Sequence, residues 1–190
     1  AIRWLCKHSA ELHIEPAKIG VWGASAGGHL VALLGVSGDV TAWDKGENLD
    51  QSSRVQAVCD WFGPADLLTF ETQKENNLTR RPASSPPADE AGTPEARLIG
   101  GPIQENQEKA RAASPVTYVT KDDAPFLIMH GDKDPLVPFQ QSTELHEALQ
   151  KTGVPSELVP IPGAGHGGGQ FNQKENLEKI AAFFEKTLKN

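Results

Sequence analysis

A lone serine lies between glycines in the stretch Gly23-Ala24-Ser25-Ala26-Gly27, and this G-x-S-x-G pattern could make Ser25 a nucleophile. In such a turn, flanking glycines let the backbone bend tightly enough to lift the serine hydroxyl clear of a sheet. A helix that starts behind the serine would add partial positive charge and the free N–H of Ala26, which could bind an oxyanion. The competing interpretation is a glycine-rich turn that only packs a helix onto a strand.

Two further segments carry side chains suited to acid–base chemistry. The stretch HGDKDPLVP, residues 130–138, contains the carboxylates of Asp132 and Asp134. The stretch GAGHGGG, residues 163–169, holds His166 among small neighbours. Serine, acid and histidine in this chain order are typical of the hydrolase triad on an open α/β sheet. The three segments together therefore favour hydrolysis more strongly than the serine motif alone.

Each of these loops is expected to follow a strand. Short apolar runs predict strands at 18–22, 55–61, 125–130 and 156–161. Helical patterns predict helices at 1–13, 26–36, 139–151 and 172–188. This alternation predicts an α/β fold with a mostly parallel sheet of about four strands and helices on both faces. Ligand chemistry gathers at the carboxyl ends of such strands, so the three loops should lie together.

Residues 1–190 are expected to form a single domain, because this length suits one core and gives no reason for two. Charged residues, Asn, Ser and several prolines fill the segment from Glu71 to about Thr93 and leave little to bury. We expect that segment to lie at the surface and to be partly mobile, within a surface insertion at about 66–113. The stretches 97–101 and 108–113 could be brief helices.

Composition excludes several classes of protein. Eighteen basic against 25 acidic residues give a formal net charge of −7 without a Lys/Arg cluster, so nucleic acid is not an expected partner. The chain has neither an apolar run of membrane-spanning length nor the layout of a signal peptide, which favours a cytoplasmic location. Cys6 and Cys59 are predicted to be free, buried thiols. No His, Cys, Asp or Glu cluster has metal-ligand spacing, so we expect neither metal nor cofactor.

Segments spread over nearly the full length resemble the α/β-hydrolase fold, and within it the carboxylesterase/lipase-like enzymes active on short acyl or acetyl esters. They are VWGASAGGHLVALLG, CDWFGPADLL, ASPVTYV, PFLIMHGDKDPLVPFQQS and PGAGHGG. The resemblance implies that Ser25 is the nucleophile, that His166 is the general base and that Asp134 orients His166. Asp132 competes for the role of the acid but is expected to cap its turn, with its carboxylate on backbone N–H groups. Asp60 is a third choice, expected to be held by backbone donors.

The other histidines receive structural interpretations. His29, one turn into the helix after Ser25, is expected to pack or to form a hydrogen bond, and His130 is expected to position the acid loop. His8, His13 and His146 fall on predicted helices and are expected at the surface or its boundary.

Enzymes of this kind carry an apolar strand and an HGGG-type loop ahead of the nucleophile strand, and that loop supplies the other half of the oxyanion hole. No such motif precedes Ser25, and four strands are found where the resemblance implies about eight. The strand at 18–22 would then be an apolar edge, which invites association. We therefore hypothesise a C-terminal portion of a longer hydrolase, or a missing half supplied by another chain, such as a second copy or a complementing N-terminal segment.

The expected function is a serine hydrolase that cleaves small carboxylic esters through an acyl-enzyme, with acetylated or feruloylated sugars as candidates. One alternative is a prolyl-oligopeptidase-like serine peptidase, which also carries Gly-x-Ser-x-Gly-Gly. A second alternative is a truncated hydrolase-fold protein without catalysis. Cleavage of p-nitrophenyl acetate but not of proline amides separates the esterase from the peptidase, and a fluorophosphonate probe of Ser25 separates both from the inactive protein.

Overall fold

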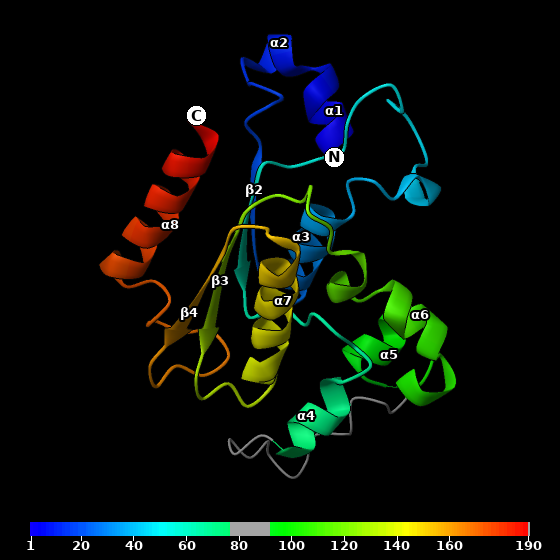
Figure 1. The fold of residues 1–190 in the computed structure, drawn as a ribbon, viewed down its shortest axis with the longest axis vertical. Helices are drawn as coiled ribbons and strands as arrows, with labels where there is room; N and C mark the ends of the chain where they lie inside the picture. Colours follow the sequence, from blue (N-terminus) through cyan, green and yellow to red (C-terminus); the bar gives the residue numbers. More distant parts are fainter. Residues whose placement is uncertain (77–91, 190) are drawn as a thin grey trace.

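A parallel sheet forms the centre of the computed structural model, which describes residues 1–76 and 92–189 (Figure 1). Its strands are β1 (Gly20–Ala24), β2 (Ala57–Trp61), β3 (Phe126–Gly131) and β4 (Ser156–Ile161). They pair in chain order, β1-β2-β3-β4, and every pair is parallel. The predicted fold class is confirmed. As expected, the strand before Ser25 is an edge strand, because in the part of the chain described here β1 pairs with β2 alone.

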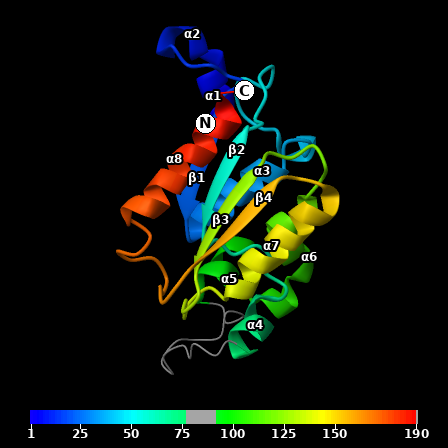
Figure 2. The ribbon, with the colours of Figure 1, turned by 60° about the vertical axis from the view of Figure 1, so that its left-hand side comes forward.

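Helices cover both faces of the sheet. Helices α3 (Ala26–Val36) and α7 (Phe139–Thr152) lie on one face, and α8 (Lys174–Leu188) lies on the other (Figures 1 and 2). Because both faces are covered, β2 and β3 are buried along their whole length. Their apolar runs are therefore continuous rather than alternating.

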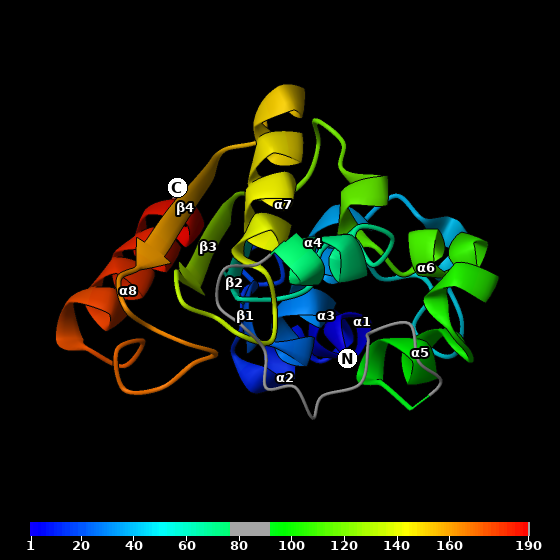
Figure 3. The same cartoon turned by 90° about the horizontal axis from the view of Figure 1, so that it is seen from below.

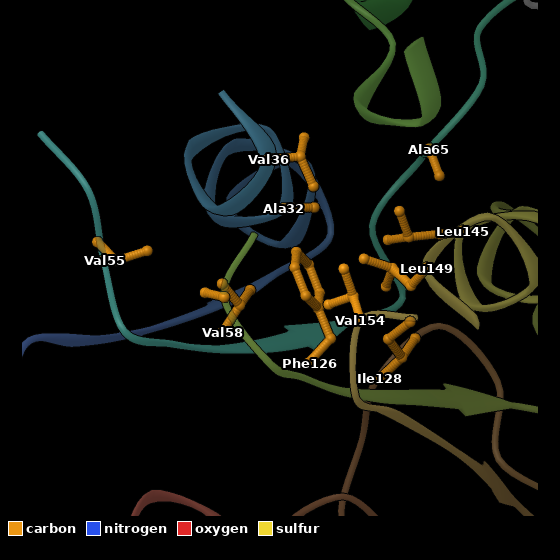
Figure 4. Packing of buried hydrophobic residues seen from close by; sticks show 11 residues of the cluster. Ala32, Val36, Val55, Val58, Ala65, Phe126, Ile128, Leu145, Leu149 and Val154 are labelled. Carbon is orange, nitrogen blue, oxygen red and sulfur yellow. The ribbon is translucent and has the colours of Figure 1, made fainter. Parts of the chain in front are cut away.

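Strand residues alternate between two cores. Val58, Phe126 and Ile128 point from β2 and β3 toward α3 and α7, where Ala32 and Leu145 complete the cluster (Figure 4). The next residues along the same strands face α8 and form the second core, with Cys59, Leu127, Met129, Phe171 and Ile180. The strands are thus fixed from both sides, and so are the loops that follow their carboxyl ends.

The first segment differs from the predicted helix over 1–13. It forms two short helices, α1 (Ile2–Lys7) and α2 (Ser9–Leu12). The break falls at His8, whose backbone leaves the helical region, and the second helix ends at His13 in a left-handed conformation (φ 54°). Cys6 is the single buried residue of the two helices, so little tertiary packing holds them in one straight rod.

Three short helices lie beside the carboxyl ends of the strands. They are α4 (Phe70–Asn76), α5 (Pro94–Ile99) and α6 (Gln107–Ala112), and α5 and α6 lie side by side in Figures 1 and 3. The two brief helices expected near 97–101 and 108–113 are confirmed as α5 and α6. Most of the segment expected to be partly mobile, residues 77–91, lies outside the described residues.

A small separate core holds α5 and α6 to the chain. It consists of Leu67, Ile99, Ile103 and Ala110. Two 3₁₀ helices, η2 (Ile103–Glu105) and η3 (Pro115–Tyr118), follow α5 and α6, and a third, η1 (Thr41–Trp43), follows α3. This core fixes the segment around Leu67 and α5 next to the carboxyl end of the sheet.

Both cysteines are free and buried, as predicted. Among the helices of residues 1–76 and 92–189, none is both long and apolar enough to cross a membrane.

Candidate active site

Ser25 occupies a strained turn between β1 and α3. Its backbone has φ 55° and ψ −120°, a conformation that residues other than glycine rarely adopt. Hydrogen bonds hold the turn on both sides: the Ser25 N–H donates to the Trp61 carbonyl at 2.8 Å, and the Ser25 carbonyl accepts from the His29 N–H at 2.9 Å. Ser25 therefore lies in the strand–turn–helix arrangement that the sequence predicted, and it is partly exposed.

The two glycines of the motif are not equivalent, which corrects the expectation that both permit the tight turn. A Cβ atom on Gly23 would overlap the carbonyl group of Gly27. A Cβ atom on Gly27 would meet nothing within 4 Å. Of these two glycines, only Gly23 is required by the close approach of β1 to α3. Gly28 is also constrained, because a Cβ there would overlap the Asp60 carboxylate.

His166 joins the serine to an acid. Its Nε2 lies 2.8 Å from Ser25 Oγ, and its Nδ1 lies 2.7 Å from Asp134 Oδ2. An ionised carboxylate only accepts hydrogen bonds, so the proton of the neutral ring is on Nδ1. Nε2 then carries a lone pair directed at the Ser25 hydroxyl. The ring is in the tautomer that can take a proton from Ser25.

Asp134 is held as an anion by convergent donors. Its Oδ1 accepts from the N–H groups of Leu136 (2.8 Å) and Val137 (3.0 Å), and its side chain is fully buried. Burial alone would raise the pKa of Asp134, but hydrogen bonds from His130, His166 and the Val137 N–H together hold that pKa well below its usual range. The carboxylate therefore stays charged and can stabilise a protonated His166.

His130 supports the same carboxylate from the buried side. Its Nε2 lies 3.0 Å from the Val137 carbonyl and 3.3 Å from Asp134 Oδ2, and its Nδ1 lies 2.7 Å from Ser142 Oγ. A carbonyl only accepts, so Nε2 carries the proton and Nδ1 can accept from the Ser142 hydroxyl. These contacts confirm the prediction that His130 positions the acid loop.

Asp132 joins the acid loop, residues 130–138, to the histidine loop, residues 163–169. Its Oδ1 accepts from the Gly163 N–H at 2.7 Å, so its carboxylate is held by a backbone donor as predicted, although across two loops rather than within its own turn. The Lys133 N–H donates to the Ala164 carbonyl at 2.9 Å, and a Cβ on Gly131 would overlap that carbonyl. The two loops are thus fixed against each other, which sets the distance between Asp134 and His166.

Asp60 is fully buried and takes no part in this chain of hydrogen bonds. Its Oδ1 accepts from the Gly63 N–H at 2.9 Å, which confirms the predicted backbone donor. Its Oδ2 has no partner within the described residues. Burial raises the pKa of Asp60 to about 6, although the hydrogen bond from the Gly63 N–H opposes that effect.

Phe62 is a residue of the site that sequence reasoning missed. Its ring packs edge-to-face on His166, with 4.7 Å between ring centroids and 61° between planes. The backbone of Phe62 has φ 45°, and its N–H donates to the Met129 carbonyl at 2.9 Å. The only signal in the sequence is a large apolar residue directly before the Gly63-Pro64 breaker.

A pocket of about 520 Å³ opens beside Ser25 and His166. Its apolar lining comes from Leu30, Pro64, Leu67, Leu98, Leu136 and Val137, and its polar lining includes His29 and Glu95. Ala26 also lines the pocket. As the first residue of α3, Ala26 has an N–H group that no carbonyl of the helix accepts, so it can face an oxyanion. Sequence reasoning placed Ala26 here but missed the contribution of α5, since Glu95 and Leu98 lie about seventy residues after Ser25.

The remaining histidines lie outside the chain of hydrogen bonds. His29 is buried and its Nδ1 lies 2.9 Å from the Pro64 carbonyl, which confirms that it forms a structural hydrogen bond. His146 Nδ1 lies 2.9 Å from Ser156 Oγ, and His13 is exposed. No group of three His, Cys, Asp or Glu side chains in residues 1–76 and 92–189 is arranged to hold a metal ion.

The sequence is similar to a known protein family over most of its length. A family model described as BD-FAE matches residues 1–149, a range that includes Ser25 and Asp134. Esterase LipQ of Mycobacterium tuberculosis is 32% identical over 168 residues, which cover 87% of this chain and 36% of LipQ. An uncharacterised peptidase of Bacillus subtilis, YuxL, is 26% identical over 93% of this chain and 23% of its own length. The chain thus spans about a third or less of these curated relatives.

Among solved structures, a truncated form of a carbohydrate esterase from gut microbiota superimposes with a TM-score of 0.86. It is 32% identical, and the match covers all of this chain and 66% of that one.

Proposed function

The chain belongs to the BD-FAE family of α/β-hydrolase esterases, and from that premise we propose that it cleaves small carboxylic esters through an acyl-enzyme on Ser25. The observation that carries this proposal is the pair of hydrogen bonds that runs from Ser25 through His166 to Asp134, at 2.8 and 2.7 Å. The Asp134 carboxylate favours the His166 tautomer whose Nε2 can take the proton of Ser25, which nucleophilic attack by a serine needs.

The first half of the reaction acylates Ser25. Ser25 Oγ attacks the ester carbonyl carbon while His166 Nε2 takes the hydroxyl proton, and the Ala26 N–H donates to the oxyanion that forms. Asp134 stabilises the protonated imidazole throughout. When the tetrahedral intermediate collapses, the bond to the alkoxide breaks, and His166 delivers its proton to the departing alcohol.

The second half releases the acid. Water attacks the acyl carbon of the Ser25 ester while His166 again takes a proton, and the new tetrahedral intermediate breaks at the bond to Ser25 Oγ. His166 returns that proton to Oγ. The carboxylic acid leaves, and the serine hydroxyl and neutral histidine are restored without any external oxidant, reductant or metal ion.

The pocket supports short substrates. Its volume of about 520 Å³ lies within the range of small-molecule sites, and its lining is mostly apolar, which suits a short acyl chain or a small alcohol. The relative LipQ is named an esterase, and the structural neighbour is named a carbohydrate esterase. Esters of sugars are therefore part of the proposal.

A second candidate is peptide hydrolysis by the same three residues, which the likeness to the peptidase YuxL favours. The mechanism would be the same except that the leaving group is an amine, which needs the proton from His166 even more than an alkoxide does. The two candidates differ in the substrate and not in the proposed catalytic residues.

One experiment tests both. Hydrolysis of p-nitrophenyl acetate and butyrate is measured with the wild-type chain and with Ser25→Ala, beside a proline p-nitroanilide, and Ser25 is labelled with a fluorophosphonate probe. Ester turnover and labelling that vanish in Ser25→Ala, without cleavage of the anilide, support the esterase. Cleavage of the anilide alone supports the peptidase. Absence of both turnover and labelling in folded wild-type protein overturns the proposed function.

A further inference from the structure

His29 lies in the same pocket as Ser25 but serves none of the proposed steps. It is one turn further along α3, it is one of the residues that line the pocket, and it is 5% exposed. Its Nδ1 lies 2.9 Å from the carbonyl oxygen of Pro64. Because a carbonyl can only accept, the proton of the ring is on Nδ1. The hydrogen bond to Pro64 thus fixes both the tautomer and the orientation of the ring.

The other nitrogen of this ring is an available acceptor. Burial lowers the pKa of His29, although the Pro64 carbonyl and the charge of Glu95 oppose that effect, so the surroundings favour the neutral ring. Nε2 of a neutral ring with its proton on Nδ1 carries a lone pair. In the part of the chain described here, the buried side-chain nitrogen and oxygen atoms without a partner are Asp60 Oδ2 and Trp61 Nε1. His29 Nε2 is not among them, and no hydrogen bond to it is found among the described residues. Because His29 is one of the residues that line the pocket, a group bound there can approach this nitrogen.

The surroundings make this acceptor selective. Leu30, Leu98 and Leu136 supply much of the apolar wall of the pocket, and Glu95 is a further acceptor. The described residues that line the pocket include no lysine or arginine. A substrate group that fills this space without a donor would leave the His29 lone pair desolvated and unpaired, and such unpaired polar groups are a strong source of discrimination.

We propose that His29 is a specificity-determining residue whose Nε2 accepts a hydrogen bond from a hydroxyl group on the part of the ester that fills the pocket. The preferred substrates are then esters with a free hydroxyl close to the scissile bond, on either the alcohol or the acyl side. This inference rests on the proposed esterase function and adds to it the chemistry that the pocket recognises.

The test uses two pairs of esters that exchange a hydroxyl for a methyl group of similar size. For the alcohol side, 2-hydroxyethyl acetate is compared with propyl acetate, and for the acyl side, p-nitrophenyl 3-hydroxybutyrate is compared with p-nitrophenyl 3-methylbutyrate. Each kcat/KM is divided by the rate constant of hydroxide-catalysed hydrolysis, which removes the intrinsic reactivity of the ester. We expect wild type to favour the hydroxylated member of one pair by roughly 2- to 10-fold, the value of one neutral hydrogen bond.

His29→Asn is the decisive variant. The Asn amide nitrogen can still donate to the Pro64 carbonyl, while the acceptor at the position of Nε2 is lost. The preference for the hydroxylated ester should therefore fall to about one, mainly through slower turnover of that ester. Leu98→Ala is the matched control, because it enlarges the pocket without touching the acceptor and should lower kcat/KM of both members of a pair alike.

The outcomes separate this inference from the proposed function. Equal corrected kcat/KM values in both pairs, or a preference that persists in His29→Asn, overturn the role of His29 and leave the esterase intact. No turnover of any ester and no fluorophosphonate labelling overturn the esterase and with it this inference. Nitrogen-15 NMR of the wild-type imidazoles gives a readout without catalysis: we expect an unprotonated Nε2 for His29 at pH 7, and a charged ring or an Nε2–H tautomer would overturn the proposal.

Discussion

His130 Nε2 lies 3.3 Å from Asp134 Oδ2, the same oxygen that accepts the hydrogen bond from His166. One carboxylate oxygen therefore meets two imidazoles, one buried and one facing the pocket. The buried His130 ring is fixed in its orientation, because its Nδ1 is hydrogen-bonded to Ser142 Oγ and its Nε2 to the Val137 carbonyl. The orientation of His166 is thus set through Asp134 from the interior of the protein.

This arrangement predicts that the two aspartates of the acid loop have very different roles. Asp134→Asn places an amide against His166 Nδ1, and an amide N–H there would force the wrong tautomer of the ring. We expect kcat on p-nitrophenyl acetate to fall by about 10⁴, the loss typical of this substitution in serine triads. Steady-state kinetics at pH 7.5 measure it.

Asp132→Asn is the control for that prediction. The Asn carbonyl oxygen can still accept from the Gly163 N–H, so the two loops stay joined and kcat should change by less than about threefold. An equal loss in both variants would mean that the acid loop contributes by its geometry and that Asp134 does not orient the base.

Local sequence patterns were sufficient for the sheet and for the members of the site that follow its strands. The apolar run before His130 predicted a central strand, and β3 is buried along its whole length, whereas the run before Ser25 predicted the partly exposed edge strand β1. Glycines mark the turns near the ends of both strands. Parallel strands bring their carboxyl ends to one edge, so Asp134 and His166 could be placed near Ser25 although 109 and 141 residues separate them from it.

What could not be predicted depends on contacts between segments far apart in the chain. The positive φ of Phe62 and the packing of its ring on His166 arise where β2, β3 and the histidine loop meet, and no local pattern encodes such a meeting. Glu95 and Leu98 reach the pocket only because α5 is held to Leu67 by a separate small core. The different demands on Gly23 and Gly27 likewise depend on how closely α3 approaches β1.

Substitution by alanine should have opposite effects on stability at Gly23 and at Gly27. In Gly23→Ala the new methyl group overlaps the backbone of Gly27, so the turn must open, and we expect a loss of about 1–3 kcal/mol in the free energy of unfolding and a loss of most esterase activity. In Gly27→Ala the methyl group enters open space in the first turn of α3, where alanine is the better helix former. We expect a gain of about 0.5–1 kcal/mol and retained activity.

Urea unfolding and ester turnover of both variants measure these effects. Similar losses in Gly23→Ala and Gly27→Ala would contradict the prediction, because they would show that the turn needs glycine at both positions.

Phe62 is predicted to support the base rather than the substrate. Phe62→Leu keeps an apolar side chain but removes the edge-to-face contact with the His166 ring. Aromatic pairs of this kind contribute about 0.5–1.5 kcal/mol of stabilisation. A less ordered His166 should lower kcat by roughly tenfold and leave KM for p-nitrophenyl butyrate nearly unchanged, since Phe62 does not line the pocket. A change confined to KM would place Phe62 in substrate binding and contradict this view.

Asp60 is predicted to make the protein less stable as the pH rises. The pKa of its carboxyl in the folded protein is about 6, above the ordinary value of 3.8, because burial disfavours the charged form. Between these values the unfolded chain releases the proton while the folded protein keeps it, so the free energy of unfolding decreases as pH increases through this window. The loss is complete above the folded pKa and amounts to about 2 kcal/mol between pH 4.5 and 7.5.

Asp60→Asn isolates this contribution. The Asn carbonyl oxygen can still accept from the Gly63 N–H, but the side chain no longer titrates. Every other group titrates alike in both proteins, so the difference between their free energies of unfolding measures Asp60 alone. From pH 4.5 to 7.5 in urea, wild type should lose about 2 kcal/mol relative to Asp60→Asn. Parallel stability curves would show that the Asp60 carboxyl ionises at the same pH in the folded and unfolded states, and that its burial is compensated by a donor at Oδ2.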